Sequence, residues 1–285
     1  MFTTRFAPSP TGRLHLGHAF SALTAWTAAK QSGGRFLLRI EDIDPTRCRP
    51  DFEAGIHEDL AWLGLGWEQP VRRQSDHFAD YAAAIEKLRA LGVLYRCFLT
   101  RTEVAAASLS APHGDGPIYL GPVDEMSEDE QETRIAKGEA FAWRLSLRYS
   151  QDLLGEQFPR LVFREEDSGP NGERGLIHAQ PALLGDVILA RKDSPASYHL
   201  AVVHDDALQD VTHVIRGQDL FASTHIHVLI QRLLDLPTPI YRHHKLQTGP
   251  DGKRYAKRDR SLTLAALRSD GVTPAEIRRR TGFAD

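Results

Sequence analysis

The sequence predicts an α/β protein: a Rossmann-type parallel-sheet domain, split by an α+β insertion and followed by a short helical C-terminal extension. The N-terminal segments carry most of this prediction, with a strand over Thr3 to Ala7, a helix from about Gly17 to Gln31 and a buried strand over Arg35 to Ile40. A loop rich in proline and glycine, from Pro8 to Arg13, separates the first strand from the helix. Because a βαβ unit makes its strands parallel, we expect a ligand site at their carboxyl ends.

The remaining elements follow from periodicity and from polar breaks. Apolar residues at helical spacing predict helices over 51–63, 76–91, 220–234, 262–269 and 274–280. Short apolar runs predict strands over 141–145, 161–163, 187–190, 199–204 and 211–215. Irregular, polar sequence predicts loops over 100–129, 165–175 and 241–260. We therefore expect the sheet core in 1–94 and 191–240, the insertion in 95–190, and the extension in 241–285.

Composition and charge exclude several classes of protein. The 285 residues are 41% hydrophobic and 26% charged, with a formal net charge of -3, so the total gives no signal for a nucleic-acid partner. Two cysteines, Cys48 and Cys97, are too few for a disulfide framework. No signal peptide is evident, and no stretch approaches the roughly 20 apolar residues of a spanning helix. We expect a cytoplasmic monomer with no membrane partner.

The first candidate site lies where the first strand meets the first helix, at Pro-Ser-Pro-Thr-Gly-Arg-Leu-His-Leu-Gly-His from Pro8 to His18. Gly17 lets the backbone approach a ligand, and a helix N-terminus attracts phosphate through its N–H groups. His15 and His18 can donate hydrogen bonds to a phosphate that gains negative charge in a transition state. Without context, such a histidine pair is more often two helix caps in a solvent-facing turn.

The context of these histidines resembles the class I aminoacyl-tRNA synthetases, whose HIGH signature reads His-Leu-Gly-His from His15 to His18 here. The preceding run from Arg5 to Gly12 narrows the resemblance to the glutamyl and glutaminyl branch. The resemblance implies that ATP is a substrate, that His15 and His18 are catalytic, and that Gly17 joins them in binding ATP. We expect Mg²⁺ to assist.

A second candidate site follows the second strand, in the run Arg-Ile-Glu-Asp-Ile-Asp-Pro-Thr-Arg from Arg39 to Arg47. The resemblance implies that Glu41 faces the ammonium group of a substrate glutamate, a charge-assisted hydrogen bond. The alternative is a surface ion-pair network of Arg39, Glu41, Asp44 and Arg47.

Two later residues, Tyr198 and Arg216, belong to segments that end in the predicted strands 199–204 and 211–215. We expect both to face the same crevice as Arg5 and Glu41. Arginine suits a carboxylate because its planar fork can bind both oxygens, whereas a lone tyrosine is more often a core residue. The resemblance assigns glutamate binding to Arg5, Phe6, Ala7, Pro8, Ser9, Glu41, Tyr198 and Arg216.

A basic segment, Gly252 to Asp259, occupies the place of the family's KMSKS loop. The resemblance makes Lys257 the catalytic lysine that neutralises charge on the leaving pyrophosphate, and Arg254 stands where the family has its first lysine. Tyr-Ala replaces the central Met-Ser or Leu-Ser pair, so the loop is a divergent copy. On composition alone, a basic loop is more often solvated surface.

The resemblance extends over nearly the whole chain to a truncated paralogue family of glutamyl-tRNA synthetase. Its members attach glutamate to the queuosine base in the anticodon loop of tRNA(Asp). The chain ends soon after the basic segment, so we expect no anticodon-binding domain of the usual kind and queuosine-containing tRNA(Asp) as the partner. Three alternatives stay open: charging of a terminal ribose, a related nucleotidyltransferase that makes another adenylate, and a non-catalytic RNA-binding relic.

Many members of the paralogue family bind zinc in the inserted lobe through Cys-x-Cys and Tyr-x-x-x-Cys. In this chain Cys97 and Tyr119 are retained, but Leu99 and Val123 replace two thiolate ligands. One cysteine and one tyrosine cannot form a four-coordinate zinc site, so we expect no zinc and a lobe held by apolar packing. The histidine pairs 225/227 and 243/244 lack third ligands, and we assign them no metal.

The implied reaction begins with in-line attack of the α-carboxylate of L-glutamate on the α-phosphorus of ATP, and pyrophosphate leaves. His15, His18 and Lys257 stabilise the phosphoryl charge. A tRNA hydroxyl then takes glutamate from the adenylate, without a protein nucleophile.

Overall fold

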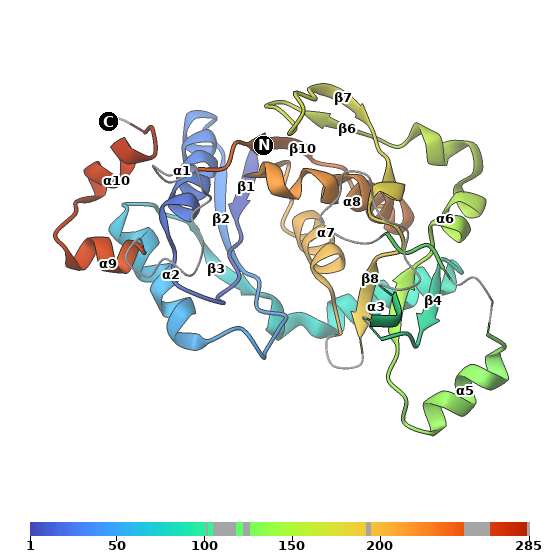
Figure 1. The fold of residues 1–285 in the computed structure, drawn as a ribbon. Coiled ribbons are helices and arrows are strands. Elements are labelled where there is room, and N and C mark those ends of the chain that lie inside the picture. The colour runs from blue at the N-terminus through green and yellow to red at the C-terminus, as the bar shows by residue number, and fades with distance from the viewer. Residues whose placement is uncertain (101, 105–117, 122–125, 192–194, 248–262, 284–285) are drawn as a thin grey trace.

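The computed structural model describes residues 1–100, 102–104, 118–121, 126–191, 195–247 and 263–283. It confirms the N-terminal βαβ unit, with β1 (Thr3–Phe6), α1 (Leu16–Gln31) and β2 (Arg35–Ile40) in sequence and β1 parallel to β2. The strand β3 (Glu68–Arg73), which the sequence did not predict, pairs in parallel with the far edge of β2. Its exposed, charged residues hide the strand pattern. These elements form the blue half of the molecule in Figure 1.

A second sheet continues the first at the edge of β1. Its strands run in the order β7 (Gly175–His178), β6 (Val162–Glu165), β10 (Ile240–His244) and β9 (His213–Gly217). β6, β10 and β9 are parallel, and β7 is antiparallel to β6. The backbone N–H of Thr212, just before β9, donates to the Thr3 carbonyl at 3.0 Å. The parallel strands therefore follow the order β3-β2-β1-β9-β10-β6, and β1 and β9 meet at its centre.

The expectation of a loop throughout 241–260 is wrong at its start, because β10 covers Ile240–His244. This strand reads Ile-Tyr-Arg-His-His, a composition with little apolar signal. Pairing with β9 and β6 on its two sides buries it nonetheless, and His243 is fully buried. Tertiary pairing rather than local propensity makes this segment a strand.

The predicted strand at 199–204 is also wrong, because these residues belong to the helix α7 (Tyr198–Leu208). Its four consecutive apolar residues, Leu200 to Val203, are all buried. A short apolar run that is buried on every side has no visible period, so a buried helix and a buried strand look alike in sequence. The helix packs between α3 (Phe78–Ala90) and α8 (Phe221–Leu234).

Of the other helices, α2 (Pro50–Trp62), α9 (Leu264–Ser269) and α10 (Pro274–Arg280) lie close to their predicted positions. In contrast, α5 (Glu128–Ala136) and α6 (Leu147–Leu154) lie in stretches for which the sequence predicted no helix or strand. Short 3₁₀ turns cover Gln74–His77, Gly155–Arg160, Pro181–Leu183 and Gln218–Leu220. A small antiparallel sheet joins β4 (Leu94–Cys97), β5 (Ala142–Leu145) and β8 (Ile188–Arg191). Residues 95–190 thus supply strands to two different sheets.

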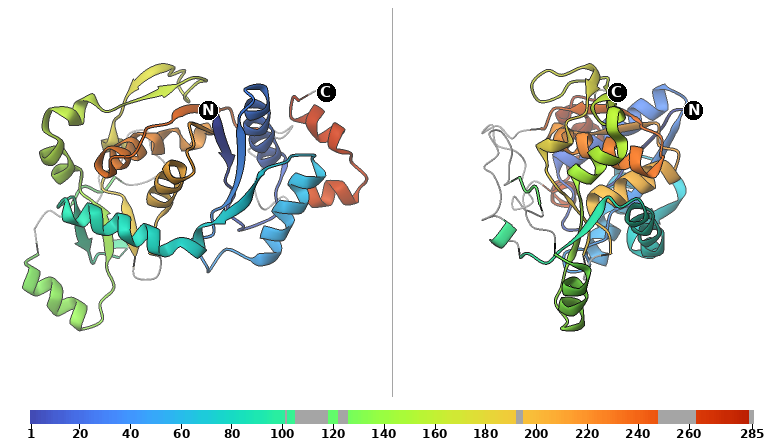
Figure 2. Two further views of the ribbon diagram at one scale, coloured as in Figure 1. Left: turned by 180° about the vertical axis from the view of Figure 1, so that it is seen from behind. Right: turned by 90° about the vertical axis from the view of Figure 1, so that its right-hand side faces the viewer.

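Two apolar cores are built on the parallel strands, and alternate residues of β2 and β9 belong to different cores. The N-terminal core receives Leu264 from α9 and Ile277 from α10, which pack against α2 and α1. The left view in Figure 2 shows these C-terminal helices beside the N-terminal elements, at the opposite end from α5 and α6. The other core joins α3, α7 and α8 to the small antiparallel sheet. No helix within the described segments is long and apolar enough to cross a membrane.

Candidate active site

A cavity of about 440 Å³ opens at the carboxyl ends of β1 and β9. This is the place where the order of a doubly wound sheet leaves a crevice. The cavity is lined by eleven residues singled out from the sequence: Arg5, Phe6, Ala7, Pro8, Ser9, His15, Gly17, His18, Glu41, Tyr198 and Arg216. The predicted phosphate and glutamate residues therefore share one cavity. The sequence did not indicate Ser21, Asp219 or His244, which also line it.

The two histidines are helix caps and cavity residues at once. His15 is the N-cap of α1, and its Nδ1 accepts a hydrogen bond from the Gly17 N–H at 3.1 Å. His18 Nδ1 accepts from the His15 N–H at 3.2 Å, and the two ring centroids lie 3.8 Å apart. A neutral imidazole that accepts at Nδ1 carries its hydrogen at Nε2. Capping therefore fixes both rings as Nε2–H donors.

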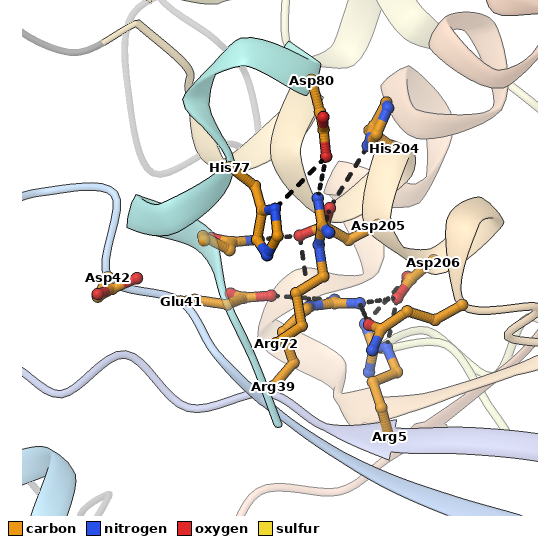
Figure 3. Close-up of polar contacts among 12 residues, drawn as sticks. Arg5, Arg39, Glu41, Asp42, Arg72, His77, Asp80, His204, Asp205 and Asp206 are labelled. Carbon is orange, nitrogen blue, oxygen red and sulfur yellow. Dashed lines mark hydrogen bonds and ion pairs between the residues drawn. The ribbon is translucent and has the colours of Figure 1, made fainter. Parts of the chain in front are cut away.

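The cavity floor is a buried network of charges, shown in Figure 3. Arg5 grips Asp206 through Nε and Nη2, at 2.9 and 3.3 Å. Arg39, which is fully buried, donates to Asp206 at 2.8 Å and to Glu41 at 3.1 Å. This arrangement corrects the surface-network alternative, because the ion pairs lie inside the protein and Arg47 is exposed.

The network divides its carboxyl groups into two kinds. Burial alone raises the pKa of a carboxyl group, and it does so for Glu41 despite the opposing charges of Arg39 and Arg5. For Asp206 burial acts in the same direction, but the guanidinium groups of Arg5 and Arg39 outweigh it and hold the pKa below its usual value. Asp206 is thus already neutralised by Arg5 and Arg39, whereas the ionised form of Glu41 would be stabilised further by an added cation.

Asp205, next to Asp206 on α7, joins the network to its surroundings. Its Oδ1 accepts from Arg72 at 2.9 Å, and its Oδ2 accepts from Gln74 at 2.9 Å and from the Tyr81 hydroxyl at 2.8 Å. Burial would raise the pKa of Asp205, but hydrogen bonds from His204, Gln74 and Tyr81 and the charge of Arg39 lower it to about 2. The carboxylate thereby fixes α7 against β3 and α3.

Arg216, at the carboxyl end of β9, is buried and engages every N–H group of its guanidinium within the protein. The acceptors are His243 Nε2 at 3.1 Å, the Tyr198 hydroxyl at 3.2 Å, His227 Nδ1 at 3.4 Å, the Leu220 carbonyl at 3.1 Å and the Thr224 hydroxyl at 2.7 Å. Tyr198 begins α7 and lines the cavity beside Arg216.

The metal predictions concern Cys97 with Tyr119 and the two histidine pairs 225/227 and 243/244. Cys97 is buried and interacts with the Tyr119 hydroxyl, while Leu99 is exposed and Val123 lies outside the described residues. No group of three His, Cys, Asp or Glu side chains within the described part of the chain could hold a metal ion. Polar contacts also hold the lobe, because the buried Asp186 accepts from the Leu147 N–H at 2.9 Å. Apolar packing is therefore not its only support.

Arg254 and Lys257 of the basic segment lie outside the described residues. The sequence also gave no indication of Asp205, Asp206 or His243 as part of the site. One signal existed: Asp205 and Asp206 follow the apolar run Leu200 to Val203 after a single histidine, and acidic side chains near buried positions need a buried partner.

Buried neutral histidines around Arg216 predict a pH-dependent stability. Burial lowers the pKa of His199 and His243 from 6.5 to about 4. Between pH 6.5 and about 4, the unfolded chain binds protons on these rings and the folded chain does not. The free energy of unfolding should therefore decrease as the pH is lowered through this range. Each ring contributes on the order of 3 kcal/mol. Urea titrations across this range measure the slope, and a constant free energy would contradict it.

Comparison with known proteins gives the family. The model for class I tRNA synthetases (E and Q), catalytic domain, matches residues 1–282. A glutamyl-Q tRNA(Asp) synthetase of Rhodobacter capsulatus is 46% identical, over 98% of this chain and 99% of that protein. A glutamate–tRNA ligase of Roseobacter denitrificans is 37% identical, over 97% of this chain and 59% of the ligase.

The solved structures agree with this match. The crystal structure of a glutamate-tRNA synthetase from Elizabethkingia anophelis matches with a TM-score of 0.72 and 28% identity, over 90% of this chain and 53% of that one. The chain thus spans about half the length of that protein. Both comparisons confirm the predicted Rossmann-type fold. The chain belongs to the class I tRNA synthetases of the glutamyl and glutaminyl type. It is a ligase, and the family implies ATP as a substrate.

Proposed function

We propose that this chain activates L-glutamate with ATP as glutamyl-adenylate and transfers the glutamate to the queuosine base in the anticodon loop of tRNA(Asp). The main support is the shared cavity, in which imidazole donors suited to a phosphoryl group stand beside charged residues suited to an amino acid. In-line attack on the α-phosphorus needs both reactants in one cavity. ATP and tRNA are cytoplasmic reactants, so the proposal places the chain in the cytoplasm.

In the activation step, His15 and His18 donate from Nε2 to the phosphoryl oxygens as negative charge builds up. Fixed donors act well here because they need no reorientation during the reaction. Lys257 neutralises the leaving pyrophosphate and Arg254 adds a second positive charge. Mg²⁺ assists, held mainly by the ATP phosphates and water rather than by a protein cage.

Glutamate is held by residues of opposite charge at its two kinds of group. Glu41 receives the ammonium, which also favours ionisation of this buried carboxyl group. Arg5 and Arg216 supply positive charge for the carboxylates. The Tyr198 oxygen accepts from Arg216, so the Tyr198 hydroxyl can donate its own hydrogen to a carboxylate in the cavity.

The choice of acceptor rests on similarity. The Rhodobacter capsulatus relative, whose name specifies tRNA(Asp), is 46% identical to this chain, whereas the Roseobacter denitrificans glutamate–tRNA ligase is 37% identical. Both relatives match nearly the whole of this chain. The difference in identity favours queuosine over a terminal ribose hydroxyl.

Two assays test the proposal. In ATP–pyrophosphate exchange with a panel of amino acids, we expect activity with glutamate and little with glutamine or aspartate. If none of the amino acids supports exchange, the result would point to the non-catalytic RNA-binding relic. Radiolabelled glutamate is then offered with queuosine-containing tRNA(Asp), queuosine-free tRNA(Asp) and tRNA(Glu). We expect label only on the first, and label on tRNA(Glu) would favour terminal charging.

A further inference from the structure

A buried row of three side chains runs away from the cavity behind Arg216. Arg216 Nε donates to His243 Nε2 at 3.1 Å, and His243 Nδ1 lies 2.5 Å from Glu165 Oε2. Glu165 and His243 are fully enclosed, so this row has no contact with solvent. Glu165 comes from β6, His243 from β10 and Arg216 from β9, three adjacent parallel strands.

The row has a fixed hydrogen-bond direction. An arginine nitrogen can only donate, so His243 Nε2 must accept and His243 must carry its hydrogen at Nδ1. This hydrogen is donated to Glu165. Burial lowers the pKa of His243 to about 4, which agrees with a neutral ring. Glu165 therefore fixes the orientation of the His243 ring, and the ring in turn fixes the position of the Arg216 guanidinium. Outer carboxylates orient metal-binding histidines in the same way.

Only a carboxylate fits at the far end of the row. Glu165 Oε1 accepts from the backbone N–H groups of Asp167 and His243, both at 3.0 Å, while Oε2 accepts from His243 Nδ1. A glutamine has a single acceptor oxygen, so its NH₂ group must face a donor on one side or the other. If the NH₂ group faces His243 Nδ1, the contact favours the tautomer with its hydrogen at Nε2, and this N–H then points toward Arg216.

We propose that Glu165 and His243 are positioning residues that hold Arg216 for the carboxylate of the amino-acid substrate. Glu165 supplies the negative charge that balances the buried Arg216. It acts through the neutral His243 ring, from the side of Arg216 away from the cavity. Arg216 lines the cavity beside Tyr198, to which its Nη1 donates at 3.2 Å, so its positive charge lies next to the ligand space although its N–H groups are engaged within the protein. This inference rests on the proposed activation of glutamate, and it adds two residues that do not line the cavity.

The first experiment compares Glu165, the last residue of β6, with Glu166, which directly follows the strand. Glu165→Gln should raise the KM for glutamate about tenfold or more in pyrophosphate exchange, while the KM for ATP changes less than about twofold. Glu166→Gln is the matched control, because Glu166 pairs with Arg242 at 2.7 Å, is partly exposed and makes no contact with Arg216 or His243 among the described residues. An unchanged KM for glutamate in folded Glu165→Gln, or equal losses for both substrates, would overturn the proposal.

A second pair of variants separates the two ends of His243. His243→Gln can keep an acceptor near Arg216, whereas His243→Asn can keep a donor near Glu165. If the role of His243 is to position Arg216, His243→Asn raises the KM for glutamate about tenfold and His243→Gln raises it several-fold less. The reverse order would show that the pair only supports the fold. Thermal unfolding of both variants confirms that they fold.

A spectroscopic measurement on the unmodified protein needs no activity. Long-range ¹H–¹⁵N correlation of the histidine rings distinguishes the two tautomers, and His243→Asn assigns the signal. We expect His243 in the Nδ1–H form at neutral pH, and the Nε2–H form would overturn the proposal. Because the tautomer is independent of the reaction, a failure to activate glutamate would refute the proposed function while leaving this result to decide the positioning row.

Discussion

Replacing His15 with asparagine should lower the kcat of glutamate-dependent pyrophosphate exchange by about a hundredfold or more, because one fixed donor to the phosphoryl group is lost. The substitution is chosen so that the helix keeps its cap. Asparagine is among the best N-cap residues, and its Oδ1 can accept from the Gly17 N–H as His15 Nδ1 does. It lacks a donor at the place of Nε2. The variant therefore separates capping from catalysis in one residue.

The control for this variant is His178→Asn, which removes an exposed imidazole from β7 and should leave both kcat and the melting temperature unchanged. His15→Asn should melt within a few degrees of the unmodified protein. A kcat within about threefold of normal would contradict a catalytic donor at His15 and leave the residue as a cap alone. That outcome would restore the alternative in which the histidine pair only ends a turn.

The sequence predicts the parts of the fold in which local pattern and tertiary environment agree. The unit from β1 to β2 is of this kind, since its glycine-containing loop, helix and apolar strand each have a strong local signal. β10 and α7 are not. The polar residues of β10 become a central strand only by pairing on both sides, and the apolar run of α7 has no exposed face to reveal its period.

The candidate site divides in the same way. His15, Gly17 and His18 form a compact motif, and Arg5 and Glu41 lie in short segments around it, so resemblance could locate them. Asp206 lies 201 positions from Arg5. Glu165 lies 78 positions from His243. A single sequence does not show which residues form such pairs, because only the folded sheet brings them together. These partners neutralise and orient residues that the motifs do reveal.

Asp205 shows how much stability such a hidden residue can carry. Both of its oxygens are acceptors only, for Arg72 on one side and for Gln74 and the Tyr81 hydroxyl on the other. Its pKa is lowered from 3.8 to about 2, so its contribution is complete at neutral pH and is lost as the pH falls through that interval. In an asparagine, the NH₂ group must face one of these donors, and the charge that balances Arg72 and Arg39 disappears.

We therefore expect Asp205→Asn to lower the free energy of unfolding at neutral pH by about 3 to 5 kcal/mol, as for other broken buried ion pairs. Asp80→Asn is the matched control. Asp80 also binds Arg72, at 2.6 Å, but its side chain is 39% exposed, and its loss should cost less than about 1 kcal/mol. Urea unfolding of the two variants measures both values. Equal decreases in the free energy of unfolding would contradict this expectation. They would mean that Asp80 and Asp205 stabilise Arg72 equally and that burial of Asp205 makes no further contribution to stability.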